Sequence, residues 1–134
     1  MKRALIDTDI LSYFFKGNSM VLRHLQSYLE IFNSVEISII TYYEITCGLL
    51  AKKAIRQLQV FEQFADENRI IPLTEKSSKI SAELYASLRE KGNHIDDIDL
   101  LIAGVAIENE MILVTNNEKH FGRIPNLKIE NWTL

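Results

Sequence analysis

The sequence predicts an α/β fold, in which helices flank a mostly parallel sheet of four or five strands in three layers. Short apolar runs alternate along the chain with longer segments whose apolar residues recur at helical spacing. The short runs are apolar throughout, as expected of parallel strands that are buried on both faces. The chain has 134 residues, of which 47% are hydrophobic and 25% charged. These values are typical of an ordinary globular protein, and we expect one domain over residues 1–134.

The first strand is predicted at Lys2–Ile6, and it leads through an acidic turn into a helix that ends near Phe15. A second helix is predicted from Ser19 to Phe32, with Ser19 as the N-cap residue. Its apolar residues share one face, which we expect to be buried. These residues are Val21, Leu22, Leu25, Leu29 and Phe32.

The second strand is predicted at Val35–Ile40. The tetrad Thr41–Glu44 fits a capping box that opens the third helix, because a Glu side chain at this spacing reaches back to the N-cap amide. A further helical stretch covers Leu58–Phe64, with Val60, Phe61 and Phe64 as its apolar positions. The third strand covers Ile70–Leu73 and is broken by Pro72 or ends just before it.

A long helix is predicted from Thr74, its cap, to Lys91, and Gly92 suits the position after its end. The next helix begins among the acids at 96–99 and ends near Asn109. The fourth strand is Met111–Val114. The remainder allows a short helical turn, an edge strand near Leu127–Glu130, and Trp132 as a packing anchor.

Bulk composition excludes several classes of protein. The formal net charge of −3 argues against a broad basic surface for nucleic acid, although it does not exclude a nuclease that binds a metal ion. The single cysteine, Cys47, excludes an internal disulfide and is expected to be a small buried hydrophobe. No segment has the length of a membrane span, so the cytoplasm is the expected location.

Polar side chains follow the predicted strands or open the next helix at several places. Asp7, Glu44, Asp99 and Asn117 all fall at such positions. One parallel sheet would bring them to the same edge, where α/β proteins bind ligands. Asp99 also lies beside the apolar stripe of its helix, so it needs a partner.

Carboxylates that converge without basic partners require a cation. Their hard oxygen atoms select Mg²⁺ or Mn²⁺, which is bound by a few carboxylates together with substrate phosphate. Phosphodiester cleavage by metal-activated water is therefore the predicted reaction class. Histidine chemistry is disfavoured because the three histidines show no metal-type spacing, and no G-x-S-x-G motif supports a serine nucleophile.

Four segments carry a family resemblance over essentially the whole chain. They are LIDTDIL, the T-x-x-E helix start, IDDIDLLIAGVA and LVTNNEKHFGRIPNLKIENW. Together they resemble a PIN domain, specifically a VapC-type ribonuclease toxin. The resemblance implies a three-layer PIN-like fold and cleavage of RNA with Mg²⁺ or Mn²⁺ held by Asp7, Glu44 and Asp99.

The resemblance extends to supporting residues. Asp9 matches a position that is usually Asn or Asp, and Asp96 one that is often glycine. Asn117 stands where many PIN domains have a fourth acid, which puts a second metal in doubt. The supporting site residues are thus Asp9, Asp96, Thr115 and Asn117, and the candidate RNA contacts are Tyr13, Lys16, Tyr42, Lys52 and Arg123.

The resemblance also implies partners. Such toxins are commonly homodimers that are inhibited by a VapB-like antitoxin, whose C-terminal segment places an Arg or Lys in the acidic site. DNA would be bound only through the antitoxin, and no membrane is involved.

Two alternatives remain open from the sequence. Asp7-x-Asp9 after a strand, with the acid pair at 96–97, would also suit a haloacid-dehalogenase-like phosphatase with Asp7 as nucleophile. That reading lacks the lysine-bearing strand end which such an enzyme requires. Asn117 in place of an acid would also suit a catalytically silent PIN-like binding subunit.

Overall fold

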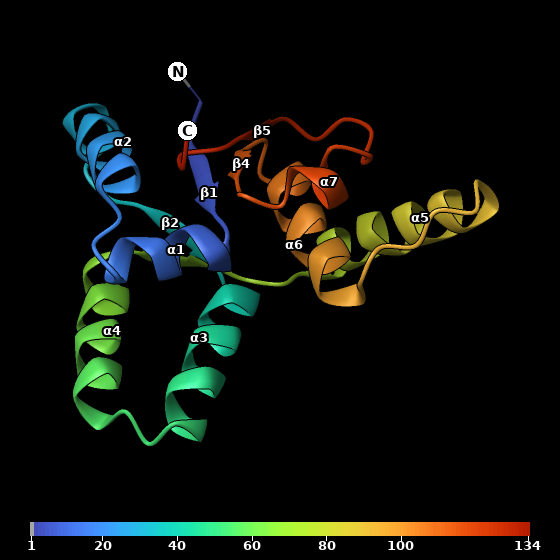
Figure 1. The fold of residues 1–134 in the computed structure, drawn as a ribbon. Coiled ribbons are helices and arrows are strands. Elements are labelled where there is room, and N and C mark those ends of the chain that lie inside the picture. Colours follow the sequence, from blue (N-terminus) through green and yellow to red (C-terminus); the bar gives the residue numbers. More distant parts are fainter. Residues whose placement is uncertain (1) are drawn as a thin grey trace.

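The computed structural model describes residues 2–134 and contains a five-stranded sheet within them. The strand order is β3-β2-β1-β4-β5, and each neighbouring pair is parallel. This arrangement confirms the predicted α/β class and includes the edge strand (Figure 1). The strands are β1 (Ala4–Ile6), β2 (Glu36–Ser38), β3 (Arg69–Ile71), β4 (Ile112–Val114) and β5 (Ile129–Glu130).

Helices cover both faces of the sheet and form the outer layers. They are α1 (Thr8–Phe15), α2 (Ser19–Ile31), α3 (Ile39–Ala51), α4 (Ile55–Glu67), α5 (Glu75–Glu90), α6 (Asp97–Glu108) and α7 (Glu118–Phe121). In Figure 1, α5 and α6 lie on one side of the strands, whereas α3 and α4 project together as a hairpin. No helix within residues 2–134 is long and apolar enough to cross a membrane.

Alternating strand residues divide the core into two clusters. Leu5 and Leu113 pack in the cluster that contains the buried residues of α5 and α6. Ile6 and Val114, one position further along each strand, pack in the cluster built from α1, α2 and α4. Because successive side chains of a strand point to opposite faces, this division follows directly from the strand geometry.

The junction between β2 and α3 differs from the prediction. Ser38 ends the strand and caps the helix, since its Oγ accepts a hydrogen bond from the Thr41 amide at 3.0 Å. The predicted strand Val35–Ile40 is therefore too long, because Ile39 already begins the helix. The capping-box interpretation of Thr41–Glu44 is wrong, since both residues lie inside α3.

The N-cap of α2 lies one residue earlier than predicted. Asn18, rather than Ser19, is the N-cap residue, and its side chain accepts hydrogen bonds from the amides of Met20 and Val21 at 3.1 Å. The predicted apolar face is buried at Val21 and Leu25 but leaves Leu22 and Leu29 each 40% exposed.

A further burial prediction is wrong. Cys47 is exposed on α3, and on α4 the apolar Val60 is also 52% exposed. Both residues lie on the α3–α4 hairpin, which projects from the sheet and buries only part of its apolar surface (Figure 1).

Other predicted boundaries are confirmed. Thr74 caps α5 through its side chain, and Gly92 adopts a positive φ of 73° after the helix ends. The third strand ends at Ile71, just before Pro72. Trp132 is 5% exposed and packs near Tyr28 and His24, as expected of an anchor.

The direction of the strand order reverses between β1 and β4. From β1 the chain adds β2 and β3 on one side, whereas β4 and β5 lie on the other. In open parallel sheets this switch point leaves a crevice at the carboxyl ends of the strands, where ligands bind. The residues that follow β1 and β4 therefore mark the candidate site.

Candidate active site

Asp7 lies at the switch point, directly after β1. Its backbone amide donates to Val114 of β4 at 2.9 Å, which extends the sheet by one rung. Its carboxylate is 5% exposed and accepts hydrogen bonds from the Thr8 amide at 2.8 Å and from the Thr115 hydroxyl at 2.7 Å. The buried carboxylate is thus fixed by groups from both strand ends.

The electrostatic environment of Asp7 disfavours its charged form. Burial is the largest effect, followed by the negative charge of Asp9 and, more weakly, that of Asp99; together they raise the pKa of Asp7 to about 7. Hydrogen bonds from Thr115 and Thr8 act in the opposite direction. Burial also raises the pKa of Asp9, and the negative charge of Asp99 raises it further. The negative charges of Asp9 and Asp99 therefore both act on the Asp7 carboxylate.

Asp99 reaches the site from the first turn of α6. Its Oδ2 lies 3.3 Å from His120 Nδ1, and this ring nitrogen also lies 2.9 Å from Asn117 Nδ2. Burial raises the pKa of Asp99, whereas the hydrogen bond and charge of His120 lower it. The α6 start and the short α7 helix are thereby linked at this site.

Glu44 is joined to the same edge by a chain of hydroxyl groups. Its Oε1 accepts a hydrogen bond from Thr8 Oγ1 at 2.7 Å, and Thr8 Oγ1 lies 3.0 Å from Thr41 Oγ1. Thr8 is the residue next to Asp7, and its amide also donates to the Asp7 carboxylate, so Thr8 contacts both Glu44 of α3 and the buried acid.

The acidic side chains have separate hydrogen-bond partners. Within residues 2–134, no group of three His, Cys, Asp or Glu side chains is arranged to hold a metal ion. Glu44 accepts a hydrogen bond from Thr8, Asp7 accepts one from Thr115, and Asp99 lies 3.3 Å from His120 Nδ1.

The other predicted site residues occupy different parts of the structure. Asp96 is exposed at the N-cap position of α6, and its charge helps to raise the pKa of Asp99. The Tyr13 hydroxyl lies at the site edge, 3.4 Å from Asn116 Nδ2. The Tyr42 ring packs on Phe61, with ring centroids 5.6 Å apart.

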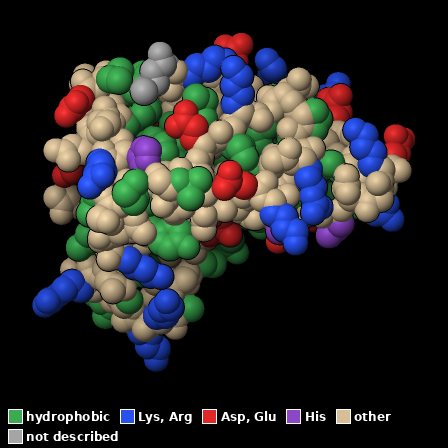
Figure 2. All heavy atoms as spheres, turned by 45° about the horizontal axis from the view of Figure 1, so that its top comes forward, with side chains coloured by type: hydrophobic (Ala, Val, Ile, Leu, Met, Phe, Trp, Pro, Cys, Tyr) green, Lys and Arg blue, Asp and Glu red, His purple; other side chains and the backbone are tan. Residues whose placement is uncertain are grey.

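Three predicted basic contacts are exposed. Lys16 follows α1 and Arg123 follows α7, both near segments that carry site residues. Lys52 ends α3 eight positions beyond Glu44, which corresponds to roughly 12 Å along a helix. Figure 2 shows Lys and Arg side chains at the lower end of the molecule, over the projecting part. The structure does not bring Lys52 to the acids.

Comparison with known proteins identifies the family. The model of the PIN domain matches residues 4–127. The chain belongs to the PIN-domain family. Among relatives of this PIN domain, ribonuclease VapC2 of Rickettsia felis is 37% identical over 135 residues. The alignment covers 96% of this chain and 96% of that one. The tRNA(fMet)-specific endonuclease VapC of Salmonella typhimurium is 33% identical over 99 residues, which are 72% of this chain and 74% of that one.

Solved structures agree with this assignment. VapBC2 from Rickettsia felis, bound to a DNA fragment from its promoter, contains a chain that superimposes with a TM-score of 0.86 at 36% identity, covering 96% of this chain and 98% of that one. DNA-bound VapBC from Salmonella typhimurium gives a TM-score of 0.84 at 28% identity, with coverage of 98% and 99%. This PIN domain is therefore a member of the VapC ribonuclease toxins, and the phosphatase alternative is set aside.

Sequence reasoning missed three residues of the PIN-domain site. Thr8 joins Glu44 to the strand end, His120 contacts Asp99, and the Asn116 amide donates to Asp9 Oδ2 at 3.1 Å. His120 follows Asn117 by three positions in α7, so the two side chains share a face. That spacing was the available signal, although it does not reveal the contact with α6.

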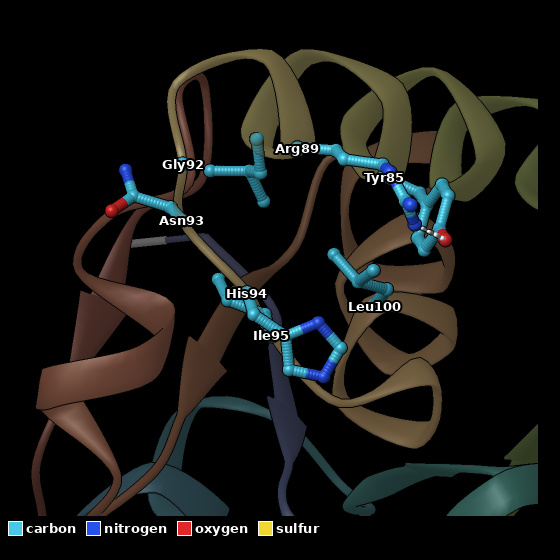
Figure 3. A pocket seen from close by; sticks show the side chains of 8 residues that line it. Tyr85, Arg89, Gly92, Asn93, His94, Ile95 and Leu100 are labelled. Atoms are coloured by element: carbon cyan, nitrogen blue, oxygen red, sulfur yellow. Dashed lines mark hydrogen bonds between the residues drawn. The ribbon is translucent and has the colours of Figure 1, made fainter.

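A separate hollow lies between the end of α5 and the start of α6. It has a volume of about 300 Å³, and Figure 3 shows Arg89 lying against Tyr85 at its rim. Arg89 donates to the Tyr85 hydroxyl at 2.7 Å. Its lining contains none of the predicted acids, so we do not place the PIN-domain active site there. The lining residues are Tyr85, Leu88, Arg89, Gly92, Asn93, His94, Ile95 and Leu100.

Proposed function

We propose that this VapC-family chain is a Mg²⁺- or Mn²⁺-dependent endoribonuclease whose metal ligands are Asp7, Glu44 and Asp99. The observation that carries the proposal is the buried Asp7 carboxylate, whose pKa is raised by burial and by its acidic neighbours. Carboxylates are rarely buried without a partner of opposite charge, and active sites are where strongly shifted pKa values concentrate.

The donor set fits a hard divalent cation. Within residues 2–134, the ion pairs of the acidic edge involve His120 alone, whereas Arg3 and Arg69 both pair with Glu36 elsewhere. Carboxylate oxygens without lysine or arginine partners suit Mg²⁺ or Mn²⁺.

Each acid is supported by a different part of the fold. Thr115 and the Thr8 amide orient Asp7, and His120 holds Asp99. Thr8 fixes the Glu44 carboxylate toward the same edge. Asp9, Asp96 and Asn117 are supporting residues that add negative charge or hydrogen bonds around the ligands.

The chemistry follows from this arrangement. A divalent ion, when bound, neutralises phosphate charge and makes a water molecule more acidic at neutral pH. The carboxylates would bind the ion and orient it, and the exposed Lys16 and Arg123 are the candidate contacts to the RNA backbone. The Tyr13 ring, at the edge of the acids, is the candidate surface for stacking of an unpaired base.

An antitoxin is the proposed regulator. An apolar groove of about 450 Å³ between α2 and α4 exposes Leu22 and Leu29 beside Phe14 and Phe64. An apolar helix of the antitoxin would cover this groove, and a basic residue of its C-terminal segment would enter the acidic site. By analogy with the promoter-bound VapBC2 of Rickettsia felis, DNA would be contacted through the antitoxin. A homodimer and a cytoplasmic location remain parts of the proposal.

Cleavage of purified RNA tests the proposal. Asp7→Asn and Asp99→Asn should each lower the cleavage rate at least about 100-fold while the protein stays folded, because loss of a ligand costs more than loss of its supporting contacts. Asp66→Asn, at an exposed acid on α4, is the matched control and should cleave normally. Undiminished cleavage by the wild-type protein in excess EDTA would refute the metal mechanism. If neither the wild type nor Asp66→Asn cleaved RNA, the silent binding subunit would be favoured.

The product ends give a second readout of the same reaction. Because water rather than the 2′-hydroxyl is the proposed attacking group, products should carry 5′-phosphate and 3′-hydroxyl ends. Ligation-based end mapping distinguishes these from 2′,3′-cyclic phosphates, which would point to histidine chemistry instead.

A further inference from the structure

We propose that Asn131 and Thr133, near the end of the chain, are positioning residues for the active site. They act through Asn116, whose backbone amide holds the carboxylate of Asp9. This inference rests on the function proposed above, since it concerns the same acidic edge. It extends that function to a segment that contains none of the predicted ligands.

The first link joins Asp9 to the loop after β4. Asp9 Oδ1 accepts a hydrogen bond from the Ile10 amide at 2.7 Å, within its own helix. Its Oδ2 accepts from the Asn116 amide at 3.1 Å. The orientation of the Asp9 carboxylate beside Asp7 therefore depends on where the loop places Asn116.

The second link joins Asn116 to the tail. Asn116 is exposed, so burial does not hold it in place. Its Oδ1 accepts a hydrogen bond from Asn131 Nδ2 at 2.9 Å and lies 3.2 Å from Thr133 Oγ1, whose hydroxyl hydrogen is shared with the closer Asn131 Oδ1. Its Nδ2 lies 3.4 Å from the Tyr13 hydroxyl. Two of the three side-chain contacts of Asn116 thus come from the tail.

The two tail residues also brace each other. Asn131 Oδ1 accepts hydrogen bonds from the Thr133 amide at 3.0 Å and from the Thr133 hydroxyl at 2.7 Å. Asn131 Nδ2 donates a second hydrogen bond to Glu118 Oε2 at 3.0 Å, at the start of α7. The tail therefore forms a small hydrogen-bonded unit against the loop and α7.

The position of this unit is fixed by the sheet and by Trp132. Strand β5 pairs with β4 in a register that places Glu130 beside Val114, and the Thr115 amide donates to the Glu130 oxygen at 2.9 Å. Asn131 consequently follows beside the 115–117 loop. Trp132, 5% exposed and stacked on His24 with ring centroids 5.8 Å apart, holds the tail on α2.

Direct Mn²⁺ binding to the purified full-length chain tests the proposal, with the electron paramagnetic resonance signal of free Mn²⁺ as the readout. Mutation of residues that orient metal ligands typically weakens metal affinity about 10- to 100-fold. Because Asn131 and Thr133 act through one further residue, Asn131→Ala and Thr133→Val should each weaken Mn²⁺ binding by a smaller factor, about 3- to 10-fold. Thr133→Ser keeps the hydroxyl and should restore wild-type binding. Hydrogen exchange of the Asn116 amide should be faster in the first two variants.

A control separates the two branches of the Asn131 contact. Glu118→Ala removes the acceptor on α7 but leaves the hydrogen bonds to Asn116, so Mn²⁺ affinity should stay at the wild-type value. A purely structural tail would lower the melting temperature of Asn131→Ala without changing Mn²⁺ affinity or Asn116 exchange, and that result would overturn the inference. If the wild-type chain bound no Mn²⁺, the proposed function would fail as well. If the wild type bound Mn²⁺ and both tail variants bound it with the same affinity, only the inference about the tail would be overturned.

Discussion

At the scale of single residues, the account depends on Asp7. Its buried carboxylate accepts two hydrogen bonds, from the Thr8 amide and the Thr115 hydroxyl, and two acidic neighbours act on its charge. These features oppose one another energetically in the metal-free protein, because burial of a charge among like charges costs stability. A bound cation would reverse that balance.

The metal-free protein should therefore be stabilised by Asp7→Asn. The folded state raises the pKa of Asp7 to about 7, whereas in the unfolded chain it is about 4. The folded state then holds a proton that the unfolded chain has released, so stability falls as the pH rises across this window. The variant removes this loss, and at pH 8 it should be more stable than the wild type by about 1–4 kcal/mol.

Urea unfolding in EDTA at pH 5 and at pH 8 measures this effect. The difference between Asp7→Asn and the wild type should grow with pH, and Asp66→Asn should show no such trend. An Asp7→Asn protein that is less stable than the wild type at pH 8 would show that the Asp7 carboxylate is not held at an energetic cost.

The helices α5 and α6 pack closely against each other at Gly104. A methyl group added at Gly104 would overlap Ser81 Oγ and lie 2.5 Å from the backbone oxygen of Ser77. Ser81 Oγ also donates to the Leu100 oxygen at 2.7 Å, so the two helices approach closely along small residues. This contact sets the position of α6, which carries Asp99.

Gly104→Ala should destabilise the protein by about 1–3 kcal/mol, because an overpacked contact forces the helices apart. Gly48→Ala is the matched control. Gly48 lies in α3 and faces open space among the described residues, so alanine there should stabilise the protein by up to about 1 kcal/mol. Thermal melting measures both changes, and equal effects of the two variants would contradict the close approach of α5 and α6.

The apolar groove between α2 and α4 gives a prediction about the antitoxin. Leu22→Asp places a charge in the groove and should weaken binding of the proposed antitoxin at least about tenfold, whereas RNA cleavage by the free chain should be unchanged. Ile31→Asp is the control, because Ile31 is 59% exposed on the same helix and does not line the groove. Calorimetric titration measures both affinities. Wild-type affinity of Leu22→Asp would place the antitoxin elsewhere.

For the molecule as a whole, much of the fold follows from hydrophobic periodicity. The alternation of apolar runs and helical segments predicted the parallel sheet, the caps at Thr74 and Gly92 and the edge strand, because these depend on local chemistry. The β2–α3 boundary was misplaced because Ser38 serves both strand and helix. The exposure of Leu22, Cys47 and Val60 could not be predicted, since it depends on which neighbours a helix meets.

The candidate site shows the same division. Asp7 and Thr115 follow β1 and β4 and are hydrogen-bonded to each other, because parallel strands bring their carboxyl ends to one edge. The hydroxyl bridge from Thr8 to Glu44, the contact of His120 with Asp99 and the hold of the tail on Asn116 depend on side chains far apart in the chain. No local pattern encodes them.

A crystal of the chain grown in Mn²⁺ and measured for anomalous scattering tests the proposed metal site most directly. We expect one anomalous peak at the carboxyl ends of β1 and β4, with oxygens of Asp7 and Asp99 at about 2.1 Å and Glu44 turned toward it directly or through water. A fully occupied Mn²⁺ ion bound elsewhere, with Asp7 and Asp99 still on Thr115 and His120 alone, would contradict it.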